Sequence, residues 1–391
     1  MNLPETIENT FLARFGEEPL LVRSPGRVNI IGEHTDYNLG FVLPAAIEKS
    51  MYIALSSRTD TLCKIVAHDL QEEFEFDLSA IGHSEKGWPN YLMGVVDQLT
   101  KAGYGVRGFQ CVFGGDIPIG AGLSSSAAIE AGLAYGLNML FDLAIEKKTL
   151  VRIAQRAENE FVGVRCGIMD MYVNIFGADR QVLKLDCRSL EHRYYPLDHS
   201  LAIVLLDTRV SHSLASTEYN KRRAECMEGV RILQQKHPWV HSLRDASLGM
   251  LSEIQADLPQ VVHRRCRYVV QENERVEEAC RMLERSDYAK LGELLYASHA
   301  GLSQEYEVSC PELDHLVASA RNLPEIYGAR MMGGGFGGCT LNLVKPEHVD
   351  KAASFLKEEY AKQFGREPFV YVTSTGSGTH RIKARSNAAV A

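Results

Sequence analysis

The sequence predicts an α+β protein of two domains. Its 391 residues exceed one ordinary hydrophobic core and fit two domains of roughly 200 residues each. Helix-like and strand-like segments occur in both halves without strict strand–helix alternation, which favours mixed or antiparallel sheets flanked by helices. A turn-rich stretch around residues 195–198 separates the halves. We therefore expect domains at residues 1–196 and 197–391.

The first half begins with strands and continues with helices. Runs of β-branched and aromatic residues predict strands at 20–31, 41–57, 62–67 and 107–114. Periodic apolar positions predict helices at 89–101, 124–144 and 147–163. The second of these helices is rich in Ala and Leu and apolar on most faces, so we expect it to be buried. The third ends near Gly163, a residue typical of helix ends.

Strands at 181–187 and 201–206 flank the expected boundary, and mostly helices follow. Helices are predicted at 216–236, 262–286, 288–300, 311–321 and 347–363, and strands at 327–332, 339–344 and 368–373. Pro311 with Glu312 behind it is a helix start, because proline is favoured at the first helical position.

Composition excludes several classes of protein. The 45% apolar and 24% charged content is typical of a soluble globular chain, and a net charge of −8 argues against nonspecific nucleic-acid binding. No apolar run reaches the roughly 18 residues of a membrane span, and the N-terminus lacks a signal peptide. Nine scattered cysteines without a Cys-x-x-Cys pair indicate reduced thiols rather than structural zinc. We expect a cytoplasmic monomer.

The run from Arg27 to Asn38 holds the densest group of chemically active side chains. Apolar Val28, Ile30 and Ile31 lead into Glu33, His34 and Asp36, which suggests a strand entering a polar turn. Two carboxylates and an imidazole at the floor of a pocket suit a ligand with many hydroxyl groups. On composition alone, a solvated polar loop explains the run equally well.

A glycine- and serine-rich loop precedes the buried helix at 124–144. Gly120 and Gly122 allow positive φ and close approach of a ligand, and a serine stands where a helix cap belongs. Free N–H groups at a helix N-terminus bind phosphate oxygens. A plain glycine turn with a serine cap is the alternative. The loop is no Walker A motif, because no Gly-Lys-Ser/Thr follows.

Read as strings, both segments resemble one family. Residues 24–38, Ser-Pro-Gly-Arg-Val-Asn-Ile-Ile-Gly-Glu-His-Thr-Asp-Tyr-Asn, resemble the galactokinase signature of the GHMP kinase superfamily. Residues 118–127 match its phosphate-loop pattern Pro-x-x-x-Gly-Leu-Ser-Ser-Ser-Ala. The resemblance implies a two-domain GHMP kinase fold with an active-site cleft between the domains. It also implies a kinase that uses ATP and Mg²⁺ to phosphorylate the anomeric hydroxyl of galactose.

The family pattern assigns catalytic and metal roles to matching residues. Residues 166–170, Cys-Gly-Ile-Met-Asp, resemble the segment that ends in the proposed catalytic base, here Asp170. Without the resemblance, an aspartate there reads more simply as a helix cap. Arg27 is expected beside it, stabilising charge on the transferred phosphoryl group. Glu158 and Ser126 occupy the magnesium-ligand positions, and Mg²⁺ suits few protein oxygens with water and phosphate completing its shell.

The resemblance also implies binding roles. Glu33, His34 and Asp36 would bind sugar hydroxyls, together with Gly167 and with Tyr219 of the segment 212–223. Trp88 resembles the family's aromatic residue beside adenine, although a core aromatic is nearly as good an interpretation. The nucleotide phosphates would lie against Gly120, Gly122, Leu123, Ser124, Ser125, Ser126 and Ala127.

A second glycine cluster, residues 333–338, formally satisfies Gly-x-Gly-x-x-Gly. A strand-like segment follows at 339–344, where a dinucleotide fold needs a helix. The string resembles the third GHMP motif, so we interpret it as a structural lid over the active site.

The chain departs from the family at several positions. Met171 stands where glutamine is usual, Asn174 where serine is usual, and Met332 where a small residue is expected; Arg165 replaces a common proline. The first three bear on which sugar is bound. Rival hypotheses are a kinase for arabinose or N-acetylgalactosamine, and a galactose sensor without turnover. Intact Arg27, Asp170 and phosphate loop favour an enzyme.

Overall fold

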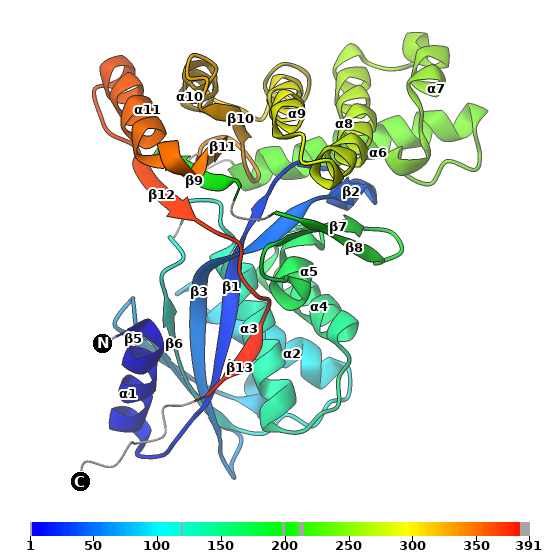
Figure 1. Ribbon diagram of the computed structural model, residues 1–391. Helices are drawn as coiled ribbons and strands as arrows, with labels where there is room; N and C mark the ends of the chain where they lie inside the picture. The colour runs from blue at the N-terminus through cyan, green and yellow to red at the C-terminus, as the bar shows by residue number, and fades with distance from the viewer. Residues whose placement is uncertain (1, 119, 198–199, 211–214, 384–391) are drawn as a thin grey trace.

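The computed structural model describes residues 2–118, 120–197, 200–210 and 215–383 and has the predicted α+β architecture (Figure 1). Ile119 of the phosphate loop, Asp198 of the boundary and residues 212–214 of the tyrosine segment lie outside the described residues. Within those ranges, no helix is long and apolar enough to span a membrane.

The first half is built on a six-stranded sheet of order β13-β1-β3-β6-β4-β5, antiparallel except for the parallel pair β4–β6. Its strands are β1 (Leu20–Asn29), β3 (Pro44–Ser57), β4 (Leu62–Ala67), β5 (Glu72–Asp77), β6 (Phe109–Gly115) and β13 (His380–Ile382). Its helices are α1 (Leu3–Phe15), α2 (Pro89–Lys101) and α3 (Ser125–Leu140).

Alternating side chains cover both faces of this sheet. Leu21 and Val112 pack with α1 on one face, whereas Val22 and Ile53 join the larger core beneath α2 and α3 on the other. Successive strand residues point to opposite faces, so both faces are apolar here. Helix α3 is therefore the buried helix that the Ala- and Leu-rich segment predicted, and its packing against the sheet places its N-terminus beside β1.

A small three-stranded sheet, β2-β7-β8, and two further helices complete the first half. The predicted strand at 41–57 is two strands, because the chain passes from one sheet to the other at Leu43. The predicted helix at 147–163 ends in a π-helical turn with Gly163 at φ 92°. These elements are β2 (Phe41–Val42), α4 (Lys147–Arg156), the π turn (Ala157–Val162), α5 (Met169–Phe176), β7 (Gln181–Asp186) and β8 (His192–Pro196).

The second half has an antiparallel sheet of order β10-β11-β9-β12 under a layer of helices (Figure 1). Its strands are β9 (Ala202–Asp207), β10 (Ile326–Met331), β11 (Cys339–Val344) and β12 (Phe369–Thr373). Its helices are α6 (Ala215–Lys236), α7 (Leu248–Glu253), α8 (Gln260–Glu284), α9 (Tyr288–Ala300), α10 (Pro311–Ala320) and α11 (Val349–Phe364).

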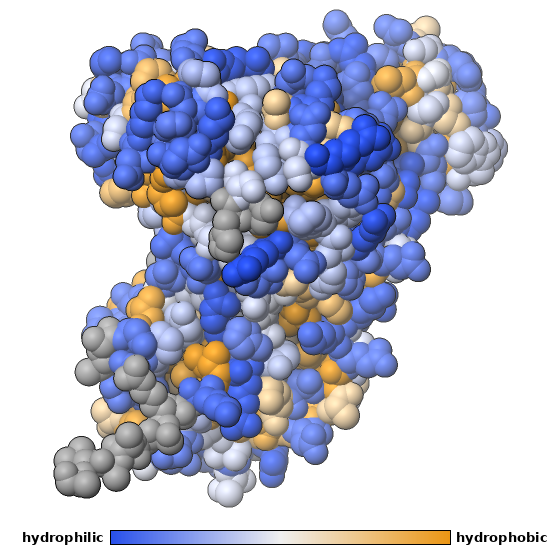
Figure 2. Space-filling view, in the orientation of Figure 1, coloured by the Kyte–Doolittle hydropathy of each residue, from blue (hydrophilic) through white to orange (hydrophobic). Residues whose placement is uncertain are grey.

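The division at 196/197 stays a proposal, and the strand pairing bears on it. β8 ends at Pro196 in the three-stranded sheet, and β9 opens the second large sheet. However, β13 returns to pair with β1, so the last described strand belongs to the first sheet. The face shown in Figure 2 is mainly hydrophilic and narrows between the two lobes.

Several elements were missed by the sequence analysis. Helix α1 carries a capping box between Asn2 and Glu5 with proline in its first turn, a signal that was available in the sequence. Helix α5 has only eight residues, too few for a periodic pattern to identify. This short helix matters for function, because it carries Asp170.

Candidate active site

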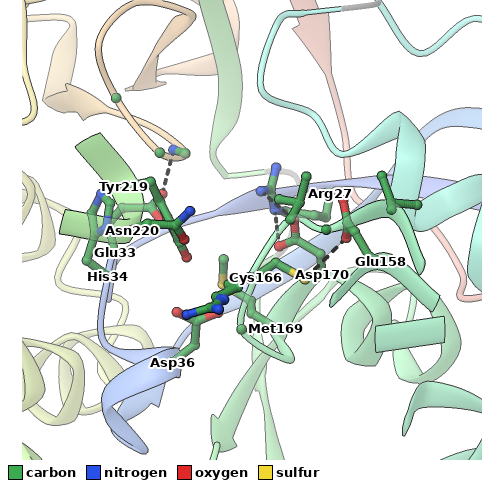
Figure 3. Close-up of a pocket in the computed structure, with 18 residues that line it drawn as sticks. Arg27, Glu33, His34, Asp36, Glu158, Cys166, Met169, Asp170, Tyr219 and Asn220 are labelled. Atoms are coloured by element: carbon green, nitrogen blue, oxygen red, sulfur yellow. Dashed lines mark hydrogen bonds and ion pairs between the residues drawn. The ribbon is translucent and has the colours of Figure 1, made fainter. Parts of the chain in front are cut away.

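A cavity of about 540 Å³ lies where the chain's two halves meet, and its size is typical of small-molecule sites. Figure 3 shows Glu33, His34 and Tyr219 on one side of it, Arg27, Asp170 and Glu158 on another, and Asp36 beside Cys166 and Met169. Predicted site residues that line the cavity are Arg27, Glu33, His34, Asp36, Glu158, Gly167, Asp170 and Tyr219.

Asp170 is held in the cavity by a bidentate ion pair. Arg27 of β1 donates from Nε to Oδ1 at 2.8 Å and from Nη2 to Oδ2 at 2.9 Å. Ser124 Oγ also donates to Oδ2, and Arg27 donates to the Gly122 carbonyl. The Arg27 side chain is 6% exposed and that of Asp170 is 25% exposed. Asp170 therefore faces the cavity with its orientation fixed by charge-assisted hydrogen bonds.

The phosphate loop adopts an unusual backbone. Gly120, Gly122 and Ser124 have φ of 80°, 74° and 58°, the left-handed region that favours glycine. Ser124 is the N-cap of α3 but makes no capping hydrogen bond, because its hydroxyl is directed to Asp170. The first N–H groups of α3 are thus left to another acceptor, such as a phosphate. The loop adjoins the cavity without lining it, and Leu123 and Ala127 are buried.

Ser126 and Glu158 form an oxygen pair next to this loop. Ser126 Oγ donates to Glu158 Oε1 at 3.2 Å, and Cys166 Sγ lies 3.2 Å from Oε2. Burial raises the pKa of Glu158 to about 7, with Asp170 adding to the effect. Two oxygens of this kind fit Mg²⁺, which keeps several waters and uses one or two protein carboxylates. The described residues contain no ready-made cluster of three or more metal-binding side chains.

Glu33 and His34 lie at the far side of the cavity. Glu33 Oε1 accepts from Arg330 Nη2 at 3.0 Å and from the Gly333 amide at 2.9 Å. His34 has φ of 61°, and its Nδ1 lies 2.8 Å from the Tyr37 hydroxyl. Burial, reinforced by Arg222, lowers the pKa of His34 to about 3, so the ring is neutral near pH 7. Neutral His34 can both donate and accept hydrogen bonds.

Asp36 and Gly167 touch each other across the cavity floor. A Cβ on Gly167 would lie 1.7 Å from Asp36 Oδ2, so only glycine permits this contact. Burial raises the pKa of Asp36 to about 7, and the charge of Asp170 adds to it. Tyr219 from α6 completes this region with its ring 5.3 Å from that of His34. Carboxylate, imidazole and phenol groups here suit a polyhydroxylated ligand.

Trp88 and the remaining loop serine are not brought to the cavity. Trp88 Nε1 donates to Glu72 at 2.9 Å, and its ring packs 5.7 Å from that of Phe113. Ser125 is the first residue of α3 and half-buried, outside the cavity lining. Their contacts with a nucleotide stay predictions.

The family departures differ in whether they line the cavity. Met171 and Asn174 are buried and do not line the cavity; Asn174 instead donates to the Pro25 carbonyl. Met332 is likewise buried outside the lining, whereas Arg165 lines it. The influence of Met171, Asn174 and Met332 on which sugar is bound stays a prediction, and it would act through packing because none of the three lines the cavity.

Sequence reasoning missed Arg330 as part of the site. Its guanidinium is fully buried and donates to Glu33 and to the carbonyls of Asn29, Ile30 and Met331. A buried arginine in a strand-like segment would have been the available signal. The neighbouring glycines 333–335 line the cavity, and their role as a lid stays a prediction.

Comparison with known protein families identifies three matching regions in the chain. Residues 9–57 match the galactokinase galactose-binding signature, residues 90–178 the N-terminal domain of GHMP kinases, and residues 257–362 their C-terminal region. A mevalonate kinase structure is 16% identical with a TM-score of 0.63 over 91% of this chain and 99% of that one, which shows the shared fold. The fold and these matches define the chain as a GHMP kinase.

Individual relatives narrow the family. The chain is 42% identical to a galactokinase of Roseiflexus sp. strain RS-1, over 96% of both chains, and 39% identical to one from Actinobacillus pleuropneumoniae, over 92% and 94%. The crystal structure of Lactococcus lactis galactokinase complexed with galactose has a TM-score of 0.92 and 34% identity, over 97% of this chain and 100% of that one. The protein belongs to the galactokinase family.

Proposed function

We propose that this protein transfers the γ-phosphate of ATP to the anomeric hydroxyl of α-D-galactose, giving galactose 1-phosphate and ADP. The observation that carries the proposal is the Asp170 carboxylate, which is held by Arg27 and Ser124 at the edge of a cavity lined by further carboxylate, imidazole and phenol groups. Phosphoryl transfer depends mainly on positioning and electrostatic stabilisation, which fixed groups of this kind supply.

Each group has a proposed place in the reaction. Asp170 accepts the proton of the anomeric hydroxyl, whose oxygen attacks the γ-phosphorus as the bond to the ADP oxygen breaks. Arg27 stabilises the charge on the transferred group. The loop N–H groups at the start of α3 bind the nucleotide phosphates. Glu33, His34, Asp36 and Tyr219 hold the other sugar hydroxyls, with Gly167 setting the position of Asp36.

Ser126 and Glu158 would hold Mg²⁺, as their oxygen pair fits this ion. The ion, when bound, neutralises charge on the phosphates. We also propose that the protein is a monomer and lies in the cytoplasm. All nine cysteines are free thiols and most are buried, which supports the proposed location because free thiols are typical of a reducing compartment.

ATP-dependent phosphorylation with Mg²⁺ tests the substrate against galactose, glucose, arabinose, N-acetylgalactosamine and galacturonate. We expect turnover to favour galactose strongly, because a site of buried polar groups rejects epimers that leave them unpaired. Preference for another sugar would replace galactose in the proposal. Binding of galactose without any turnover would support the sensor hypothesis instead.

Replacing Asp170 tests the role of the base. Asp170→Asn should lower kcat by about 10²–10⁴-fold, the usual share of general base catalysis, while galactose affinity by calorimetry stays within a few-fold. Asp179→Asn is the matched control, since that side chain is 57% exposed and does not line the cavity. If Asp170→Asn turns over at near the original rate, Asp170 is not the base.

A further inference from the structure

Glu130, in the middle of α3, is a buried carboxyl without a protein partner. Its exposed fraction is 0%, and within the described part of the chain neither oxygen receives a hydrogen bond. Other fully buried acids in the protein have partners: Glu33 accepts from Arg330, and Glu272 accepts from Gly32 and Ser298. Leaving a carboxyl unpaired in the interior is costly, so a group outside the protein is expected to satisfy it.

Helix geometry directs Glu130 toward Ser126. The two residues are four apart on α3, which places their Cβ atoms roughly 5–6 Å apart on one face. Helical side chains lean toward the helix N-terminus, so Glu130 leans over the turn that carries Ser126. Ser126 in turn donates to Glu158 at 3.2 Å. Helix geometry therefore places the Glu130 side chain next to Ser126, whose hydroxyl together with Glu158 is the pair of oxygens proposed to bind Mg²⁺.

The charges around Glu130 point to a cation. The charged groups that act on it are Glu158 and Asp170, both acidic. Asp170 has Arg27 as its partner, whereas the described contacts of Glu158 are the Ser126 hydroxyl and the Cys166 thiol. Arg27 also acts on Glu158, but its hydrogen bonds go to Asp170 and the Gly122 carbonyl, so among the described residues neither Glu130 nor Glu158 is paired directly with a cation. A divalent ion at Ser126 and Glu158 would compensate both.

We propose that Glu130 is a positioning residue of the magnesium site that accepts a hydrogen bond from a metal-bound water behind Ser126 and Glu158. The proposal rests on the function proposed above. We place a water between Glu130 and the ion because Glu130 makes no hydrogen bond to Ser126 or Glu158 among the described residues. Mg²⁺ keeps several of its waters, and carboxylates that bind such waters strengthen metal binding.

Binding of Mn²⁺ to the whole protein, measured by electron paramagnetic resonance without nucleotide, tests this directly. Glu130→Gln and Glu130→Met should weaken Mn²⁺ binding about 10–100-fold, the usual effect of losing such a partner, with the larger loss for methionine. Galactose affinity by calorimetry should stay unchanged. Glu160→Gln is the matched control, because Glu160 is an exposed glutamate on the same π turn as Glu158.

Thermal unfolding separates this role from a structural one. Because Glu130 has no protein partner, Glu130→Met should leave the metal-free midpoint equal to or above that of the original protein. Saturating Mn²⁺ should then raise the midpoint less in the variant. Unchanged Mn²⁺ affinity in both variants, or a lower metal-free midpoint with unchanged affinity, would overturn the proposal. If Glu130 has no effect on Mn²⁺ binding, the proposed phosphorylation of galactose is unaffected. If no sugar of the panel is phosphorylated, the measured effect of Glu130 on Mn²⁺ binding still holds.

Discussion

Arg330 allows a sharp test of the contacts that hold Glu33 in place at the cavity. Its guanidinium is fully buried and spans the end of β1 and the glycine loop through Glu33. Arg330→Met keeps a long apolar stem but leaves the Glu33 carboxylate with the Gly333 amide as its remaining described donor. Breaking a buried ion pair in this way costs about 3–5 kcal/mol, because a charge is left unpaired in the interior.

The double variant measures the energetic coupling between Arg330 and Glu33. Adding Glu33→Gln to Arg330→Met removes the stranded charge, so the two changes together should destabilise less than their sum, by about 0.5–3 kcal/mol. The free energy of unfolding would be measured in urea, with circular dichroism and tryptophan fluorescence compared for a single transition. Arg285→Met, at an exposed arginine, is the control. A loss below about 1 kcal/mol for Arg330→Met, or strict additivity, would refute this account.

Two further predictions concern Asp36. Gly167→Ala would place a Cβ 1.7 Å from Asp36 Oδ2 and displace that carboxylate. Galactose binding should weaken at least about tenfold, because losing hydrogen bonds to a charged group costs roughly 1.5–3 kcal/mol. Gly105→Ala is the control and should leave galactose binding unchanged, since a Cβ there meets open space. Retained affinity in Gly167→Ala would show that the contact is not needed. Because the raised pKa of Asp36 lies at about 7, the group is mostly neutral at pH 6 and ionised at pH 8, and the ionised form accepts sugar hydroxyls better. Galactose affinity, measured without nucleotide, should therefore rise from pH 6 to pH 8, while His34 stays neutral throughout. If the affinity of Asp36→Asn rises with pH as steeply as that of the original protein, Asp36 is not the group responsible.

Local patterns in the sequence were enough for most regular elements. Helices α2, α6 and α8–α11 and strands such as β9 and β11 follow their predicted ranges closely, because each buries one periodic face. Two exceptions have different reasons. Helix α5 is too short to show a period, and the run at 41–57 is divided between two sheets, a choice made by pairing with distant strands.

Short strings of sequence were sufficient to identify the chemical groups of the site: a phosphate loop, a polar turn after β1 and a candidate base, each in a segment that resembles a known family. How these groups are arranged around one cavity follows from the packing of distant segments. This packing joins Arg27 to Asp170 across 143 residues, clamps Glu33 with Arg330 and leaves Glu130 buried without a partner. Motifs and helix or strand periods can be recognised from residues that are close in the sequence. Burial and the pairing of charges depend on which distant segments pack together, and no local pattern specifies that packing.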